Sequence, residues 1–150
     1  MTELLLDTSA YSALRRGHEE IHRRLRQAHA IYANPIVLGE LRAGFGGGRQ
    51  GKKNEGYLQR FLASPRAGVL TIDEETSERY AFILNSLWAA GTPVPTNDIW
   101  IAASAMQHGL AVLTTDSHFL KISQILVHCP PPPGNIKRDN LGNKPRLSRL

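Results

Sequence analysis

The sequence has little of what would place it in several large protein classes. It contains a single cysteine, Cys129, so an intramolecular disulfide framework is excluded and a reducing cytoplasm is expected. No window approaches eighteen consecutive apolar residues, so no membrane-spanning helix is predicted. The amino terminus also lacks a basic segment followed by a long apolar one, which argues against a secretory signal.

What the chain does contain fits one basic, folded domain. Its 150 residues are enough for one domain with a proper core and too few for two. The 18 Lys and Arg residues exceed the 13 Asp and Glu residues, which gives a formal net charge of +5. A basic surface of this kind favours a polyanionic partner, nucleic acid before membrane, although basic charge also serves solubility alone.

Strands and helices alternate along the sequence. This alternation predicts an α/β fold with a central, mostly parallel sheet of about five strands and helices on both faces. The expected strands cover residues 4–6, 30–33, 68–72, 111–114 and 125–128, and the expected helices cover residues 8–16, 18–29, 35–43, 57–64, 73–90 and 97–108.

Two segments are predicted to lie outside the packed core. Residues 44–56 combine glycines with arginine and lysine, so we predict a mobile basic loop. Residues 130–150 begin with four prolines and continue with basic residues, which predicts an extended basic tail after a domain over residues 1–129.

Four acidic residues occupy distinctive places in this pattern. Asp7 and Asp116 each follow a predicted strand, and the carboxyl ends of parallel strands meet at one edge of a sheet. Asp98 lies in the first turn of a helix, where unpaired backbone N–H groups favour an anion. Glu40 projects from the middle of a helix. We therefore expect the four carboxylates to converge on one site.

Converging carboxylates need cations or protons. Two carboxylates about 4 Å apart repel each other by about 4 kcal/mol at an effective dielectric constant of about 20. Oxygen ligands select hard ions, so Mg²⁺ or Mn²⁺ is expected rather than zinc. Such an ion polarises a phosphodiester and lowers the pKa of an attacking water. Together with the basic surface, the acids predict metal-dependent hydrolysis of nucleic acid.

Each acid also has an ordinary structural explanation. Asp7 and Asp116 could be helix N-caps, Asp98 a first-turn charge, and Glu40 an exposed helix residue. Taken one at a time, these explanations are the simpler ones. The joint pattern favours a shared site.

That joint pattern resembles the PIN-domain nucleases and, within them, the VapC-type toxins of toxin–antitoxin modules. The resemblance covers roughly residues 3–128 and implies a PIN-like three-layer α/β fold. It also implies a metal-dependent endoribonuclease whose acidic quartet, Asp7, Glu40, Asp98 and Asp116, binds Mg²⁺ or Mn²⁺ and activates water. The matching segments, in the family's order, are residues 5–10, 40–44, 97–103 and 113–119.

The resemblance carries further expectations. Thr8, Ser9 and Thr115 match polar positions that support the metal pocket. An RNA substrate, a homodimer and a cognate antitoxin that blocks the site are also implied. The alternatives are a PIN-type nuclease of RNA processing that is not a toxin, and a module that binds RNA without cutting it. Four carboxylates argue against the second alternative because they repel RNA unless metal is present.

Other motifs rank lower. Residues 18–22 match the zinc motif H-E-x-x-H, but their arginine-rich context is typical of a solvated helix face. A phosphatase with an Asp nucleophile usually has a second Asp two residues on, where this chain has Ser9. Trp88 and Trp100 are expected in the core or at an interface. The histidines that show no mutual metal spacing are His29, His108, His118 and His128.

Overall fold

The computed structural model describes residues 2–131. Its five strands form one parallel sheet in the order β3-β2-β1-β4-β5. The strands are β1 (Glu3–Leu6), β2 (Ala30–Ala33), β3 (Ala67–Val69), β4 (Ala111–Leu113) and β5 (Val127–His128). The helices are α1 (Thr8–Arg15), α2 (Glu19–Gln27), α3 (Pro35–Gly46), α4 (Gly51–Leu62), α5 (Glu74–Ala90), α6 (Thr96–His108) and the 3₁₀-helix η1 (Ser117–Lys121).

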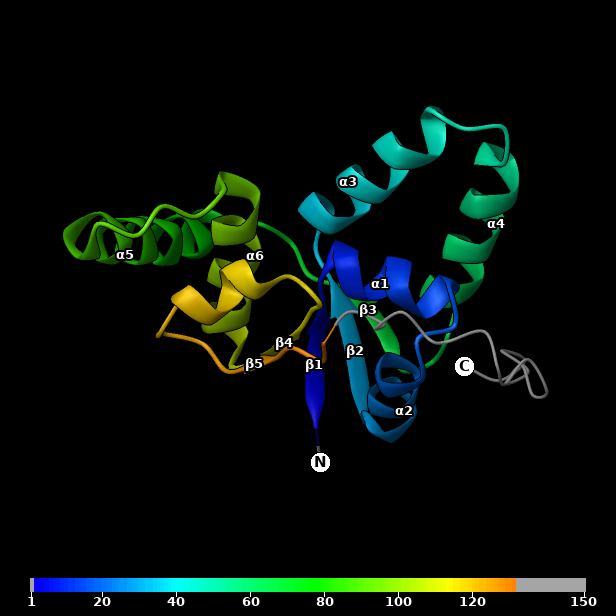
Figure 1. Cartoon of the computed structure of the whole chain (residues 1–150), viewed down its shortest axis with the longest axis horizontal. Helices are drawn as coiled ribbons and strands as arrows, with labels where there is room; N and C mark the ends of the chain where they lie inside the picture. The colour runs from blue at the N-terminus through cyan, green and yellow to red at the C-terminus, as the bar shows by residue number, and fades with distance from the viewer. Residues whose placement is uncertain (1, 132–150) are drawn as a thin grey trace.

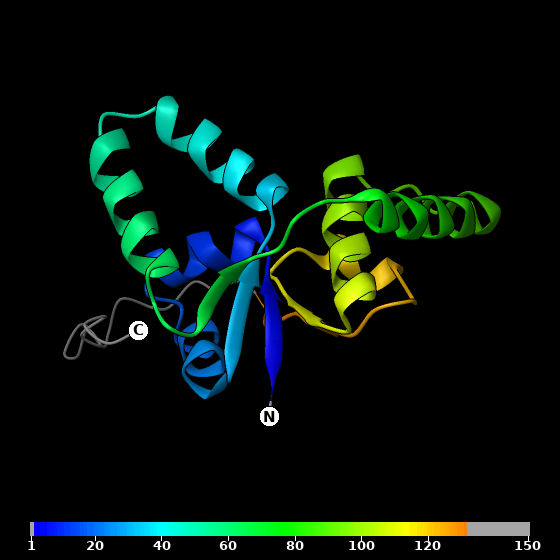
Figure 2. The same cartoon turned by 180° about the vertical axis from the view of Figure 1, so that it is seen from behind.

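Helices cover both faces of the sheet, which confirms the predicted α/β class. In Figures 1 and 2, helices α1 to α4 lie beside β1 on the side of β2 and β3, and helices α5 and α6 lie on the side of β4. This division follows from chain order, because the connections reach β2 and β3 in one direction and return to β4 in the other, and such crossovers are right-handed. The strand order therefore reverses between β1 and β4, and α/β proteins bind ligands at such a switch point.

The central strand explains why the sheet forms where it does. Leu4, Leu5 and Leu6 of β1 are each at most 1% exposed, as expected for a strand with helices on both faces. The register pairs Leu6 with Leu113 of β4, and the Asp7 N–H then donates to the Leu113 carbonyl at 3.0 Å. The residues that follow β1 and β4 are consequently neighbours.

Side-chain caps fix where the helices begin. Asn34 Oδ1 accepts from Val37 N at 3.0 Å at the start of α3, with Pro35 at the first helical position. The same Asn34 is fully buried, and its Nδ2 donates to Ser104 Oγ of α6 at 3.0 Å. This bond joins α3 to α6 across the switch point.

The prediction of a mobile loop over residues 44–56 was wrong. Helix α3 continues to Gly46 and helix α4 begins at Gly51, so only residues 47–50 connect two helices. Each glycine costs up to about 1 kcal/mol in a helix. That cost is offset because Leu58 of α4 is 1% exposed and the Arg15 guanidinium lies 3.9 Å from the centre of the Tyr57 ring. The basic residues here belong to a helical hairpin.

Other boundaries differ by a few residues from those expected. Strands β3 and β5 are shorter than predicted, and α2 ends at Gln27. The predicted basic tail, residues 130–150, lies outside the described residues apart from its first two. Within residues 2–131, no helix is long and apolar enough to cross a membrane.

Candidate functional site

Asp7 is held at the carboxyl end of β1 by hydroxyl groups. The residue is 3% exposed and is the N-cap of α1. Its Oδ2 accepts from Ser9 Oγ at 2.7 Å, from Thr114 Oγ1 at 2.8 Å and from Ser9 N at 3.3 Å. Burial raises the pKa of Asp7, and the bonds from Ser9 and Thr114 oppose this rise. The ordinary capping role and a place in a polar cluster therefore coexist.

Thr114 joins two of the predicted acids, a contact that the sequence reasoning missed. Its hydroxyl is fully buried, donates to Asp7 and accepts from Asp116 N at 2.9 Å. Thr115, the expected supporting residue, donates through its backbone N–H to Ser9 Oγ at 3.0 Å. The register of the parallel strands β1 and β4 would have predicted this contact, because pairing Leu6 with Leu113 places Asp7 beside Thr114.

Glu40 reaches the cluster from the middle of α3. Thr8 Oγ1 donates to Glu40 Oε1 at 2.8 Å, which links the first turn of α1 to α3. Thr8 and Ser9 thus each hydrogen-bond one of the predicted acids. This hydrogen bond fixes Glu40 beside α1, which the explanation of Glu40 as an ordinary exposed helix residue does not account for.

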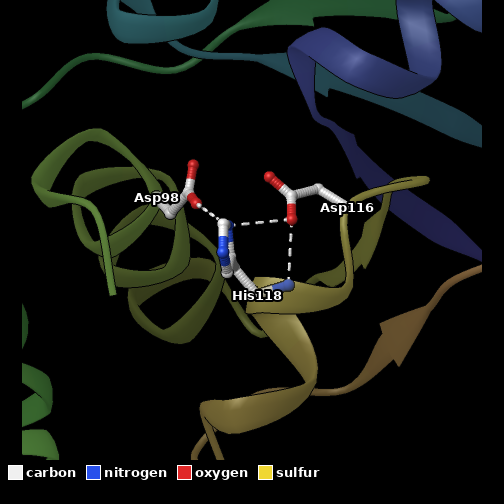
Figure 3. A group of neighbouring side chains, drawn as sticks. All are labelled: Asp98, Asp116 and His118. Carbon is white, nitrogen blue, oxygen red and sulfur yellow. Dashed lines mark hydrogen bonds and ion pairs between the residues drawn. The ribbon is translucent and has the colours of Figure 1, made fainter. Parts of the chain in front are cut away.

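Asp98, Asp116 and His118 form the tightest group at this edge (Figure 3). One ligand atom from each lies within 4.8 Å of the other two. His118 Nδ1 is 3.0 Å from Asp116 Oδ1 and 3.7 Å from Asp98 Oδ2. Asp116 is the N-cap of η1, and its Oδ1 accepts from His118 N at 2.9 Å. His118 showed no metal spacing with the other histidines because its partners are acids.

The electrostatics of Asp98 tie all four predicted acids together. Burial, followed by the charges of Asp116 and Asp7 and, more weakly, Glu40, raises the pKa of Asp98 to about 6, while His118 lowers it. Asp98 is 8% exposed, and within residues 2–131 its Oδ2 has no hydrogen-bond partner.

This arrangement fits a divalent cation. Buried polar atoms normally have a polar partner. A cation would both be the partner of Asp98 Oδ2 and reduce the repulsion among the acids. The donors are mainly carboxylate oxygens, which suit Mg²⁺ and Mn²⁺. The residues present therefore meet the requirements of such an ion.

The H-E-x-x-H segment has a structural role instead. His18 is the N-cap of α2, with Nδ1 accepting from Ile21 N at 3.3 Å. Glu20 pairs with Arg23 and Arg24, as expected for a solvated helix face. In the described part of the chain, the cluster of Asp98, Asp116 and His118 is the one that brings metal-binding side chains together.

Comparison with known proteins identifies relatives of the whole domain. A family model for the PIN domain matches residues 4–125. Ribonuclease VapC4 from Mycobacterium tuberculosis is 37% identical over 92 residues, which are 61% of this chain and 71% of that protein. The DNA-bound VapBC structure from Salmonella typhimurium has a TM-score of 0.76 at 26% identity, covering 86% of this chain and 98% of that chain. VapBC-5 from Mycobacterium tuberculosis, of the VapBC family of toxin–antitoxin systems, shares the fold, with a TM-score of 0.67 at 21% identity over 87% of this chain and 100% of that chain.

Proposed function

The chain belongs to the PIN domain family, and on that premise we propose that it is a metal-dependent endoribonuclease, a VapC-type toxin inhibited by a cognate antitoxin. One observation carries the metal-dependent part of this proposal. The carboxylate of Asp98 is buried, one of its oxygens has no hydrogen-bond partner among residues 2–131, and the charges of three more acids act on it. A cluster of this kind is costly without a cation.

In this proposal Asp7, Glu40, Asp98 and Asp116 hold the cation. A Mg²⁺ or Mn²⁺ ion held by these residues would supply the chemistry that lowers the pKa of a water molecule and stabilises negative charge on the phosphate. The surrounding groups position the carboxylates. Ser9 and Thr114 orient Asp7, and Thr8 orients Glu40. These hydrogen bonds hold the carboxylates in position, so the site would need little reorganisation to bind the ion.

The basic helical hairpin of α3 and α4 supports RNA as the substrate. Arg49, Lys52 and Lys53 are exposed at its tip and on α4. The hairpin begins with the helix that carries Glu40, so phosphate contacts there would lead the strand toward the acids. Backbone phosphates are recognised by such residues without reading the base sequence.

An antitoxin partner is supported by the relatives rather than by a feature of this chain. VapBC-5 belongs to a family of toxin–antitoxin systems and shares this fold over nearly its whole length. A nuclease that cuts cellular RNA must be restrained in the cell that makes it. The alternative, a PIN-type nuclease of RNA processing, would need no such partner.

A second copy of the chain is the proposed occupant of the outer face of α5. No charged residue occurs from Tyr80 to Gly91. Phe82 is 57% exposed and Trp88 69% exposed on this helix, which extends away from the sheet in Figure 1. Two copies of a chain with net charge +5 repel each other, so an uncharged face is the surface on which they can meet.

The homodimer makes a measurable prediction. The purified chain should sediment with twice its mass of 16.6 kDa, and Trp88→Glu should return it to the single mass because a charge would be buried without a partner. Leu126→Glu is the matched control, since Leu126 is 75% exposed on the connection to β5. A wild-type chain that stays at the single mass at high concentration would exclude the dimer.

Metal removal tests the catalytic proposal. Total cellular RNA incubated with the purified chain, free of antitoxin, should be cut into discrete fragments with Mn²⁺ or Mg²⁺ and left intact with excess EDTA. Returning the metal after EDTA should restore the cleavage, because Ser9, Thr114 and Thr8 hold Asp7 and Glu40 through hydrogen bonds from the protein itself.

Two other outcomes would redirect the proposal. Cleavage that persists in EDTA would exclude the metal-dependent mechanism. Tight RNA binding with no cleavage in either metal, at any RNA tested, would favour a module that binds RNA without cutting it.

A further inference from the structure

His118 lies between two of the four acids in a way that points to cation binding. Its ring stands between the carboxylates of Asp98 and Asp116 (Figure 3). In the described part of the chain, His118 Nδ1 and Asp98 Oδ2 are both buried atoms with no well-formed hydrogen bond. Buried nitrogen and oxygen atoms normally have a polar partner. These two atoms lie 3.7 Å apart, so one positive ion between them would serve as a partner for both.

We propose that His118 is a direct ligand of the cation through Nδ1, and that it makes the site prefer Mn²⁺ to Mg²⁺. This inference rests on the proposed function only in that both use the same metal site. Imidazole nitrogen suits transition metals, whereas Mg²⁺ is bound by oxygen. Carboxylates serve both ions, so the histidine is the group that separates them.

The distances agree with a shared ion. Two ligand atoms at right angles around an ion about 2.1 Å away lie about 3.0 Å apart, and two opposite ones lie about 4.2 Å apart. The separations of His118 Nδ1 from Asp116 Oδ1 and Asp98 Oδ2, 3.0 and 3.7 Å, fall within this range.

The local fold holds the ring in place. Asp116 caps η1 by accepting a hydrogen bond from the His118 backbone N–H. This bond keeps the His118 imidazole next to the Asp116 carboxylate. The next residue, Phe119, is fully buried and anchors η1 in the core. Asp98 is presented from the first turn of α6. The three ligand atoms therefore come from two anchored elements.

A different role for His118 predicts the opposite result. If the imidazole only paired with the two acids as a cation, it would compete with metal. Removing it would then strengthen Mn²⁺ binding, and no nitrogen would be bonded to the ion. Binding measurements and spectroscopy separate the two roles.

The test uses the full-length chain and Mn²⁺ itself. Electron paramagnetic resonance should give the Mn²⁺ affinity, and electron spin echo modulation should detect ¹⁴N bonded to the bound ion. We expect His118→Ala to abolish the nitrogen modulation and to weaken Mn²⁺ binding at least about tenfold, the loss seen on removing even an outer partner of a ligand. Mg²⁺ affinity, from competition with Mn²⁺, should change by less than about threefold because Mg²⁺ takes oxygen ligands. His108→Ala, at the exposed end of α6, should change neither quantity.

Labelling the wild-type chain with ¹⁵N-histidine tests the nitrogen ligand without a variant, so the result does not depend on whether His118→Ala folds. The modulation should change to that of ¹⁵N in the otherwise unaltered protein. Absence of nitrogen coupling in the wild type, or stronger Mn²⁺ binding by His118→Ala, would overturn the assignment. Since no measurement here uses RNA, an inactive chain with nitrogen coupling would count against the proposed function alone.

Discussion

Asp98→Asn should lower the rate of RNA cleavage at least about 10³-fold. Asparagine keeps the size of the side chain but removes the negative charge at the centre of the four acids. Losing the several kcal/mol that a bound ion contributes to the transition state gives a rate loss of this order, because each 1.4 kcal/mol is about tenfold. Single-turnover cleavage of RNA with saturating Mn²⁺ measures the effect.

A matched change elsewhere controls for the general effect of removing one negative charge. Glu75→Gln also converts an acid to its amide, on the exposed surface of α5 where Glu75 pairs with Arg79. It should cleave RNA at close to the wild-type rate. If Asp98→Asn also cleaved within about tenfold of wild type, Asp98 would not be a ligand whose charge matters.

The same Asp98→Asn variant should be more stable than wild type when metal is absent. The pKa of Asp98 is raised in the folded chain from 3.8 to about 6, so the folded state favours the protonated carboxyl. That preference stabilises the fold below about pH 4 and is lost as the pH rises through about 6. Asparagine carries no charge at any pH, so at pH 7.5 in EDTA its free energy of unfolding should exceed that of wild type by up to about 3 kcal/mol.

Denaturant unfolding at pH 4 and pH 7.5 checks the sign. The advantage of Asp98→Asn should shrink toward zero at pH 4, where the aspartate is protonated. Adding Mn²⁺ at pH 7.5 should stabilise the wild type more than the variant. A variant that is less stable than wild type in EDTA at pH 7.5 would contradict the repulsion among the acids.

Thr114→Val is expected to damage both the fold and the activity. Valine matches the shape of threonine but leaves the Asp116 N–H without an acceptor and removes one donor from Asp7. The free energy of unfolding should fall by about 1–3 kcal/mol. Cleavage should slow by about 10- to 100-fold, since a group that orients a ligand contributes on this scale.

Thr115→Val is the comparison that decides which threonine matters. Among residues 2–131 the Thr115 hydroxyl makes no hydrogen bond. The backbone N–H of Thr115 donates to Ser9 Oγ, and valine retains this N–H. This variant should stay within about 0.5 kcal/mol of wild type. Equal losses in the two variants would mean that the hydroxyl of Thr114 has no special role.

Local signals predicted much of the fold. Asn34-Pro35 and Asp73 begin α3 and α5 as expected, because a side-chain cap acts within three or four residues of itself. The placement of Asp7 and Asp116 at one edge followed from parallel strands alone. These features depend on short stretches of chain and on a general rule of sheet geometry.

Contacts between distant segments decided what local signals could not. The glycines at residues 44–56 suggested a loop, yet packing of Leu58 and the pairing of Arg42 with Glu55 support two helices there. Spacing between histidines does not reveal His118, because its partners are acids: Asp116, two residues away, and Asp98, on another helix. In both cases the deciding interaction joins residues that propensity treats separately.

The position of β1 in the sheet has a consequence for the order of folding. Its first neighbour, β2, follows within thirty residues, whereas its other neighbour, β4, begins at Ala111. Contacts over such separations form late because closing the long loop costs entropy. During synthesis the amino-terminal half can pair β1 with β2, and β2 with β3, before Asp98 and Asp116 have been made. A nascent chain that carries only Asp7 and Glu40 lacks half of the proposed quartet, so the proposed metal site can form only after β4 and the residues that follow it have been made.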